Sequence, residues 1–185
     1  GADTHSDDAY GCLCEGTAQC EGYAKAFLYV ARRAGLEVMC VPGQSASGGN
    51  HVWNIAAIDG AYYNIDLTWD DDNTYCGETV HNCFAVADTG FSDHWADTSV
   101  YQPPVCTDNM ETYYYVNGYV LNEFSQLAGR LQSWMGQQAG VVTEFHVSDA
   151  SIADAVQQAL AQELQNSGYH VVWDEVRQVA VIFAT

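Results

Sequence analysis

The fold is decided by the stretch His51-Val-Trp-Asn-Ile-Ala-Ala-Ile58, Asp59-Gly60, Ala61-Tyr-Tyr-Asn-Ile-Asp66-Leu-Thr-Trp69. Two runs rich in β-branched and aromatic residues flank an Asp-Gly pair, and this pattern is the strongest short signal for a β-hairpin with a two-residue turn. A turn of that kind pairs Ile58 with Ala61. The pairing then places Trp53 opposite Asp66 and His51 opposite Thr68.

This register brings a histidine and a carboxylate to the same face of the hairpin. His51 and Asp66 become diagonal neighbours roughly 7–8 Å apart at Cα, which is within reach of their side chains. A shift of one residue would put them on opposite faces. The same face carries further residues that make it apolar enough to receive a helix: Trp53, Ile55, Tyr62 and Asn64.

The segment that begins at Cys20, Cys-Glu-Gly-Tyr-Ala-Lys-Ala-Phe-Leu-Tyr-Val-Ala-Arg-Arg-Ala-Gly35, predicts such a helix. Its apolar residues recur on one face, Arg32 and Arg33 lie in the last turn, and Gly35 suits the position just after the helix. Cys20 is therefore expected at the helix N-terminus. If the helix packs on the hairpin face that carries Trp53, then Cys20, His51 and Asp66 become neighbours.

These three residue types together are typical of nucleophilic catalysis. A thiol attacks as the thiolate, and the unpaired N–H groups of a helix N-terminus favour that anion. Histidine moves protons near neutral pH, and a carboxylate fixes its tautomer and stabilises its charge. Taken singly, Cys20 and His51 would be ordinary buried residues and Asp66 a polar turn or strand residue. Their combination favours the catalytic interpretation.

Composition excludes several classes of protein. The chain has 185 residues, of which 48% are hydrophobic and only 16% charged, so intrinsic disorder is not its main state. Lys and Arg number 5 against 24 Asp and Glu, giving a formal charge of −19 that repels nucleic acids and anionic lipids. No apolar run approaches the length that spans a membrane.

The seven cysteines are Cys12, Cys14, Cys20, Cys40, Cys76, Cys83 and Cys106. Their odd number leaves one unpaired if the rest form disulfides, and with Cys20 as the odd thiol the other six would form three bridges. Such bridges fit a secreted or cell-surface protein, with a signal peptide presumed removed. Fully reduced cysteines remain an alternative, as does a redox or metal site at Cys12-x-Cys14, which is a weak zinc signal alone.

Other segments give a coarser prediction. Residues 37–41, 82–87 and 112–116 are expected to be strands, and 43–50 a loop. A change of character near residue 119 indicates two domains, a core over 1–119 and a small accessory domain over 120–185. The accessory domain is expected to contain a helix over 121–135, a strand over 141–147, a helix capped by Asp149, and strands over 169–174 and 178–184.

The remaining polar clusters receive no function. Asp70-Asp71-Asp72 lacks the spacing of a calcium loop and is interpreted as a solvated turn. Histidines without partners at metal-ligand spacing are assigned no role: His81, His94, His146 and His170. The sequence therefore predicts neither a metal nor an organic cofactor.

Taken together, Cys20-Glu-Gly-Tyr-Ala-Lys-Ala-Phe, Ala34-Gly-Leu, His51-Val-Trp-Asn and Tyr62-Tyr-Asn-Ile-Asp66-Leu-Thr-Trp-Asp70 resemble the core of the transglutaminase-like superfamily, most closely its bacterial secreted or surface branch. The resemblance covers roughly residues 9–117. It implies an α+β, papain-like core, with a nucleophile helix packed on an antiparallel sheet, and Cys20, His51 and Asp66 at the triad positions. The chain departs from the family in its short N-terminal segment and in Cys12 and Cys14.

The resemblance implies an acyl-transfer enzyme acting on amide bonds of protein or peptide substrates, with cell-wall peptides among the candidates. It would be a cysteine peptidase or deamidase when water accepts the acyl group, and a cross-linking enzyme when an amine does. The alternative is a binding or structural module at the cell surface in which the triad is unused.

Overall fold

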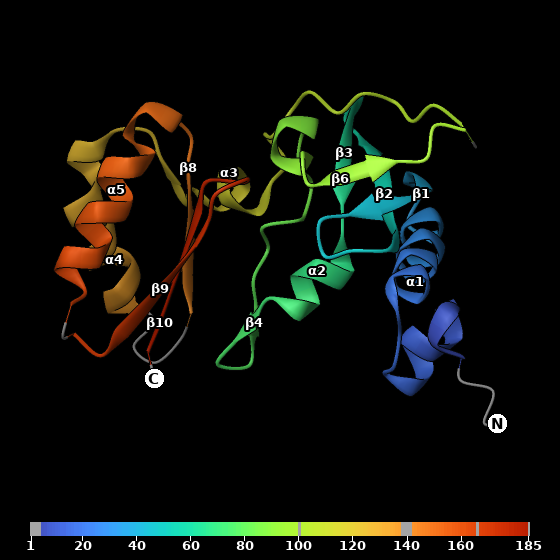
Figure 1. Cartoon of the computed structure of the whole chain (residues 1–185), viewed down its shortest axis with the longest axis horizontal. Coiled ribbons are helices and arrows are strands. Elements are labelled where there is room, and N and C mark those ends of the chain that lie inside the picture. Colours follow the sequence, from blue (N-terminus) through green and yellow to red (C-terminus); the bar gives the residue numbers. More distant parts are fainter. Residues whose placement is uncertain (1–4, 100, 138–141, 166, 185) are drawn as a thin grey trace. The chain divides into compact units, whose positions relative to one another are not determined.

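The computed structural model describes residues 5–99, 101–137, 142–165 and 167–184. The chain consists of two compact units, Gly1–Asp72 with Cys83–Thr112, and Asn73–Asn82 with Tyr113–Thr185 (Figure 1). This division differs from the predicted boundary at residue 119, because residues 73–82 and 113–119 group with the second unit. Both units mix helices with sheets, which confirms the α+β prediction. No helix of the described ranges is long and apolar enough to cross a membrane.

Helix α1 (Cys20–Arg33) begins and ends where the sequence predicts. Gln19 before it has extended backbone angles, so Cys20 is the first helical residue. At the other end, Gly35 adopts φ +90°, a conformation that glycine reaches without the steric penalty of a Cβ. The two basic residues of the last turn lie where the helix dipole favours positive charge.

The sheet of the first unit has the strand order β3-β2-β1-β6. Its strands are β1 (Glu37–Ser45), β2 (Asn50–Ile58), β3 (Ala61–Ile65) and β6 (His94–Ala96). Ile58 pairs with Ala61 as predicted, around a turn in which Asp59 and Gly60 both have positive φ. The predicted loop over 43–50 is shorter than expected, because β1 continues through Ser45 and pairs there with β6.

The hairpin ladder ends earlier than the sequence predicts. Asn54 and Ile65 are its last partners, so the expected pairs of Trp53 with Asp66 and of His51 with Thr68 do not form. The physical reason is that Asp66 starts a helix: its Oδ1 accepts hydrogen bonds from the backbone N–H groups of Thr68 and Trp69. Helix α2 (Leu67–Asp72) follows.

The acidic run in α2 is also more ordered than predicted. Asp70 is buried, and its Oδ1 accepts a hydrogen bond from the backbone N–H of Cys83 at 2.8 Å. Asp71 accepts a hydrogen bond from the Tyr23 hydroxyl of α1. The interpretation of this run as a solvated turn is therefore wrong, because two of its carboxylates have hydrogen-bond partners from elsewhere in the first unit.

Helix α1 packs on the face of the sheet opposite to the one predicted. Ala31 of α1 clusters with Val38, Ala56 and Ile65, so the helix covers the face of the sheet to which Ala56 belongs. The face that carries Trp53 is covered instead by segments from 83 to 106. The predicted strand over 82–87 is reduced there to an isolated bridge between Asn64 and Val86. A short 3-10 helix, η3 (Asp88–Phe91), leads from this segment toward β6.

The N-terminal segment folds against the start of α1. It forms two short helices, η1 (His5–Asp7) and η2 (Gly11–Glu15). Gly22 of α1 faces this segment: a Cβ added there would lie 2.4 Å from the backbone oxygen of Ser6. The first turn of α1 thus requires a residue without a side chain at this position.

Gly22→Ala is expected to lower the free energy of unfolding by about 1–3 kcal/mol, because backbone rather than a flexible side chain would have to move. Urea unfolding followed by tryptophan fluorescence measures the change. Gly129→Ala in α4 is the matched control, because nothing lies within 4 Å of its added Cβ. Equal stability of Gly22→Ala and the wild-type chain would contradict this contact.

The second unit has a sheet of order β7-β8-β10-β9, in which β7 and β8 are parallel and the other pairs antiparallel. Its elements are β4 (Thr74–Tyr75), β5 (Glu78–Thr79), α3 (Tyr113–Asn117), β7 (Val120–Leu121), η4 (Phe124–Gln126), α4 (Leu127–Gln137), β8 (Thr143–Val147), α5 (Ala150–Glu163), β9 (Tyr169–Asp174) and β10 (Val179–Ala184). The predicted strand over 112–116 is wrong, since residues 113–117 form a helix. Residue 141 of the predicted strand 141–147 lies outside the described residues.

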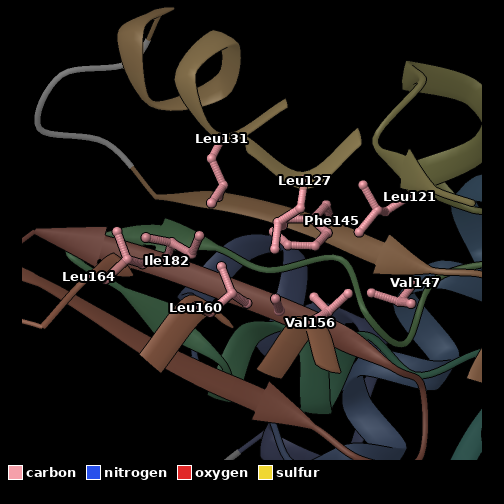
Figure 2. Packing of buried hydrophobic residues seen from close by; sticks show 10 residues of the cluster. Leu121, Leu127, Leu131, Phe145, Val147, Val156, Leu160, Leu164 and Ile182 are labelled. Carbon is pink, nitrogen blue, oxygen red and sulfur yellow. The ribbon is translucent and has the colours of Figure 1, made fainter. Parts of the chain in front are cut away.

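Two buried hydrophobic clusters make up the core of the second unit, and the one drawn in Figure 2 lies between the sheet and the helices α4 and α5. Asp149 caps α5 as predicted, because its side chain accepts a hydrogen bond from the backbone N–H of Ser151. The fully or almost fully buried residues share one face of the sheet and the facing sides of the helices: Leu121, Leu127, Leu131, Phe145, Val147, Val156, Leu160, Leu164, Ala180 and Ile182. The second unit thus has buried hydrophobic clusters of its own.

Candidate active site

His51 and Asp66 meet in the first unit, as the hairpin predicts. Nε2 of His51 lies 2.6 Å from Oδ2 of Asp66, and both side chains are buried, with 7% and 1% of their surfaces exposed. His51 comes from the start of β2, and Asp66 from the junction of β3 and α2. The contact between His51 and Asp66 forms although the pairing of β2 with β3 ends at Asn54 and Ile65, because Asp66 is the residue directly after β3.

Asp66 is held by four donors. Its Oδ1 accepts from the N–H groups of Thr68 and Trp69 at 3.0 and 3.3 Å, and its Oδ2 accepts from His51 and His94 at 2.6 and 3.1 Å. Burial alone raises the pKa of Asp66, but the hydrogen bonds from the two histidines outweigh it and lower the pKa to about 2. Asp66 is therefore ionised at neutral pH and only accepts hydrogen bonds.

The ionised carboxylate fixes the tautomer of His51. Because Asp66 only accepts, Nε2 of His51 carries the proton of this hydrogen bond. In the neutral ring the lone pair then lies on Nδ1, and no described residue donates a hydrogen bond to that nitrogen. Nδ1 of His51 is thus the atom of this pair that is free to exchange a proton with a reacting group.

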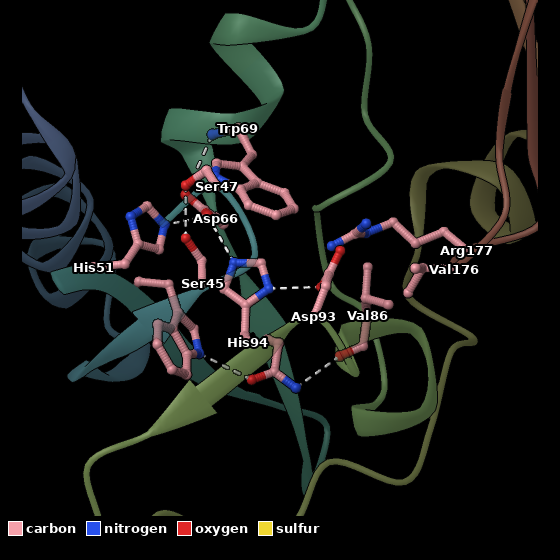
Figure 3. Close-up of polar contacts among 12 residues, drawn as sticks. Ser45, Ser47, His51, Asp66, Trp69, Val86, Asp93, His94, Val176 and Arg177 are labelled. Carbon is pink, nitrogen blue, oxygen red and sulfur yellow. Dashed lines mark hydrogen bonds and ion pairs between the residues drawn. The ribbon is translucent and has the colours of Figure 1, made fainter. Parts of the chain in front are cut away.

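His94 is the functional-site residue that the sequence analysis missed. Its Nε2 contacts Oδ2 of Asp66, and its Nδ1 contacts Oδ1 of Asp93 at 2.8 Å (Figure 3). Burial lowers the pKa of His94, but the hydrogen bonds to Asp66 and Asp93 outweigh it and raise the pKa above the ordinary value. The sequence signal for His94 was weak, because it lies between Phe91 and Trp95, and apolar neighbours of this kind are as typical of a core histidine as of a functional one.

His51, Asp66 and His94 also offer the one group of metal-ligand atoms in the described part of the chain, all within 4.8 Å of one another. A tetrahedral ion bound at about 2.0–2.2 Å holds its ligand atoms roughly 3.3–3.6 Å apart. The contacts of Asp66 to the two histidines are shorter, 2.6 and 3.1 Å, and are hydrogen-bond lengths. Shared protons fit these atoms better than a metal ion does.

Cys20 is half-buried and is a free thiol at the first residue of α1. The direction of α1 follows from Asn54 of β2, whose Nδ2 donates to the backbone oxygen of Ala24 at 3.1 Å. Ala24 lies one helical turn after Cys20, roughly 6 Å along the axis, and Asn54 lies roughly 10 Å along the strand from His51. Since Ala31 packs farther along β2, against Ala56, the start of α1 points toward the His51 end of the strand.

The direction of α1 agrees with the predicted meeting of Cys20, His51 and Asp66 only in part. The described residues contain no hydrogen bond between Cys20 Sγ and His51. The structure thus brings His51 and Asp66 together, and the catalytic role of all three residues stays a prediction.

The other six cysteines are also free thiols in the structure, which agrees with the fully reduced alternative rather than with three bridges. Burial raises the pKa of Cys106 to about 12, with a further contribution from Asp88. Burial likewise raises the pKa of Cys40 and of Cys12. These three thiols are thereby disfavoured as thiolate nucleophiles.

Comparison with models of protein families finds no family that matches this chain. One curated protein is similar over a part of its length: human kyphoscoliosis peptidase, a transglutaminase-like protein, is 34% identical over 61 residues. The aligned part covers 27% of this chain and 9% of the human protein. The chain thus matches a small fraction of that relative, and the similarity links it to a transglutaminase-like peptidase at the level of a distant, partial homology.

Proposed function

We propose that the first unit is a papain-like cysteine hydrolase that acts on amide bonds of proteins or peptides, with Cys20 as nucleophile, His51 as acid–base and Asp66 as the group that orients His51. The observation that carries this proposal is the buried hydrogen bond from His51 Nε2 to Asp66 Oδ2, which leaves Nδ1 for a reacting group. The position of Cys20 at the start of α1 and the partial similarity to a peptidase support it.

In the acylation step, the thiol proton of Cys20 passes to Nδ1 of His51, and the sulfur attacks the carbonyl carbon of the amide. The C–N bond then breaks while His51 returns the proton to the leaving nitrogen. A thioester on Cys20 remains, and an amine or ammonia departs. Asp66 stabilises the imidazolium through its hydrogen bond and keeps the ring oriented.

In the deacylation step, a water molecule gives a proton to His51 and its oxygen attacks the thioester carbon. The C–S bond breaks, the carboxylic acid leaves, and the sulfur regains the proton. Water is the proposed acceptor because an amine acceptor requires a site from which water is excluded, and no residue pattern here predicts one. Neither step needs a cofactor, since the proton and the electron pairs are exchanged among substrate, Cys20 and His51.

The test uses the full chain with three assays on an unfolded protein substrate such as casein: new amino termini, ammonia release from glutamine, and incorporation of a fluorescent primary amine. We expect at least one of the first two products, and we expect Cys20→Ala to abolish it. Cys14→Ala is the matched control, because Cys14 is an exposed thiol in the neighbouring η2. If the wild-type chain is no more active than Cys20→Ala in any of the three assays, the result favours the alternative of an unused triad.

A further inference from the structure

The hydrogen bonds of the site continue beyond the proposed triad. Asp93, His94, Asp66 and His51 form an unbroken chain of alternating carboxylates and imidazoles, which Figure 3 shows joined by dashed lines. We infer that His94, held by Asp93, is a positioning residue that fixes the Asp66 carboxylate so that Asp66 orients His51. This inference rests on the proposed function for its catalytic meaning, but its geometry stands independently.

The contacts at both ring nitrogens define the protonation state of His94. Nε2 faces Oδ2 of Asp66 at 3.1 Å and Nδ1 faces Oδ1 of Asp93 at 2.8 Å. An imidazole donates from both nitrogens only when it is protonated. The raised pKa of His94 agrees with this state. The charged and titratable groups that face His94 are Asp66, Asp93 and His51, whose ring centroid lies 5.5 Å from that of His94.

The surroundings of His94 suit a buried cation. Its side chain is 1% exposed. Phe91 stacks on the ring with centroids 4.1 Å apart, and the rings of Trp69 and Trp53 lie at 4.5 and 5.2 Å. Aromatic rings attract a cation through their quadrupoles and exclude water, so they hold the ring in one orientation between its two carboxylates. This packing makes His94 a rigid support for Asp66 rather than a mobile proton donor.

His94 acts on the carboxylate oxygen that matters for catalysis. Oδ1 of Asp66 is already fixed by two backbone donors, while Oδ2 accepts from both His51 and His94. Without His94, Oδ2 of Asp66 would have His51 as its one described partner. The oxygen and the His51 ring could then move together. The side chain of Asp93 is largely buried, with 12% of its surface exposed, and fixes His94 from the other side.

Two variants separate positioning from mere packing. His94→Phe preserves the aromatic packing but removes both donors, whereas His94→Gln restores an amide donor toward Asp66. We expect His94→Phe to slow the alkylation of Cys20 by iodoacetamide at pH 6 by about ten- to hundredfold, the effect of losing one hydrogen bond to a charged group. His94→Gln should recover part of this loss. His170→Gln, at an exposed histidine of β9, is the matched control and should leave the rate unchanged.

A spectroscopic measurement tests the geometry without any reaction. In protein labelled with ¹⁵N-histidine, we expect both ring nitrogens of His94 to be protonated at pH 7, and Nε2 alone to be protonated in neutral His51. Asp93→Asn should lower the pKa of His94, and because asparagine has nearly the same shape as aspartate this variant also serves if His94→Phe does not fold. A neutral His94 at pH 7 in the wild-type chain would overturn the inference.

The two measurements distinguish failure of this inference from failure of the proposed function. A wild-type Cys20 without enhanced reactivity, together with a doubly protonated His94 and a His51 tautomer disturbed in His94→Phe, would refute the enzyme but support the positioning role. A reactive Cys20 whose rate is the same in wild type and His94→Phe would leave the enzyme standing and overturn the positioning role.

Discussion

His51→Gln is expected to lower kcat/KM for amide hydrolysis by about 10²- to 10⁴-fold, the range that general acid–base catalysis supplies. Glutamine keeps an amide donor that can reach Oδ2 of Asp66, so the buried carboxylate retains a partner at that position. What it lacks is the basic Nδ1, the nitrogen to which no described residue donates a hydrogen bond. The variant therefore tests proton transfer with little change in packing.

The measurement is steady-state hydrolysis of whichever peptide or glutamine substrate the product assays identify. The thermal midpoint should stay close to that of the wild-type chain, and the exposed-histidine variant His170→Gln should keep full activity. A loss of less than about threefold in kcat/KM for a folded His51→Gln protein would remove His51 from the proposed mechanism, because a proton-transfer residue contributes more than that.

Asp66→Asn is expected to reduce both stability and activity. The carboxylate is 1% exposed and accepts four hydrogen bonds. Asparagine has one oxygen and one NH₂ group, so its NH₂ group must face either the two backbone N–H groups or the two histidines, all of which are donors. The charge of His94 is then paired with Asp93 alone. Breaking a buried ion pair in this way lowers the free energy of unfolding by about 3–5 kcal/mol. Catalysis should fall further, by up to about 10⁴-fold, because the tautomer of His51 is no longer fixed.

The pH dependence of stability gives this prediction a second readout. The pKa of Asp66 is lowered from its usual 3.8 to about 2 in the folded chain, so its contribution is present above pH 4 and is lost as the pH falls toward 2. That contribution is roughly 2 kcal/mol for a shift of this size. The pKa of His94 is raised above 6.5, so its contribution is complete below pH 6.5 and is lost as the pH rises through the folded pKa.

Urea unfolding at pH values from 2 to 9 measures both the loss of the Asp66 contribution at acid pH and the loss of the His94 contribution at high pH. The difference in unfolding free energy between wild type and Asp66→Asn should shrink below pH 4 and again at alkaline pH. A difference that stays constant across the whole range would show that Asp66 is not coupled to the two histidines. Asp154→Asn is the control, because Asp154 lies exposed on α5 in the second unit.

The hairpin shows how far local sequence determines this site. Asp59-Gly60 imposes positive φ at both turn residues, and this alone fixes the pairing of Ile58 with Ala61. The contact of His51 with Asp66 follows from that register, so it was predictable from one dipeptide and a count of residues. The helix of Cys20 was predictable for a similar reason, because its apolar face, its two basic residues in the last turn and Gly35 lie within sixteen consecutive residues.

Features that depend on distant segments were not predictable in this way. The face on which α1 packs depends on distant residues: Cys83, Val86, Phe91 and Cys106 cover the side with Trp53, and the side with Ala56 is left for the helix. The strand that carries His94 has three residues and exists because it pairs with the end of β1. A segment this short has no periodicity, so the contact of His94 with Asp66 appears only in the folded chain.

Tyr113-Tyr114-Tyr115 illustrates a third limit. Tyrosine favours strands, yet this segment forms the one-turn helix α3. Its packing explains the difference: Tyr114 is buried and its hydroxyl donates to Glu144 of β8 at 2.7 Å. Tyr113 stacks on His81, whose Nδ1 also contacts Glu144. Tertiary contacts to one buried carboxylate thus override the local preference of three tyrosines.

The central claim is that Cys20 reacts as a thiolate supported by His51 and Asp66, and its most direct test is the rate at which iodoacetamide alkylates each cysteine between pH 5 and 9. Mass spectrometry of the digested protein resolves Cys20 from the exposed Cys14, which serves as the internal standard. We predict that at pH 6 Cys20 reacts at least about tenfold faster than Cys14, and that His51→Gln removes this advantage. Equal rates for Cys20 and Cys14 at pH 6 in the wild-type protein would contradict the account.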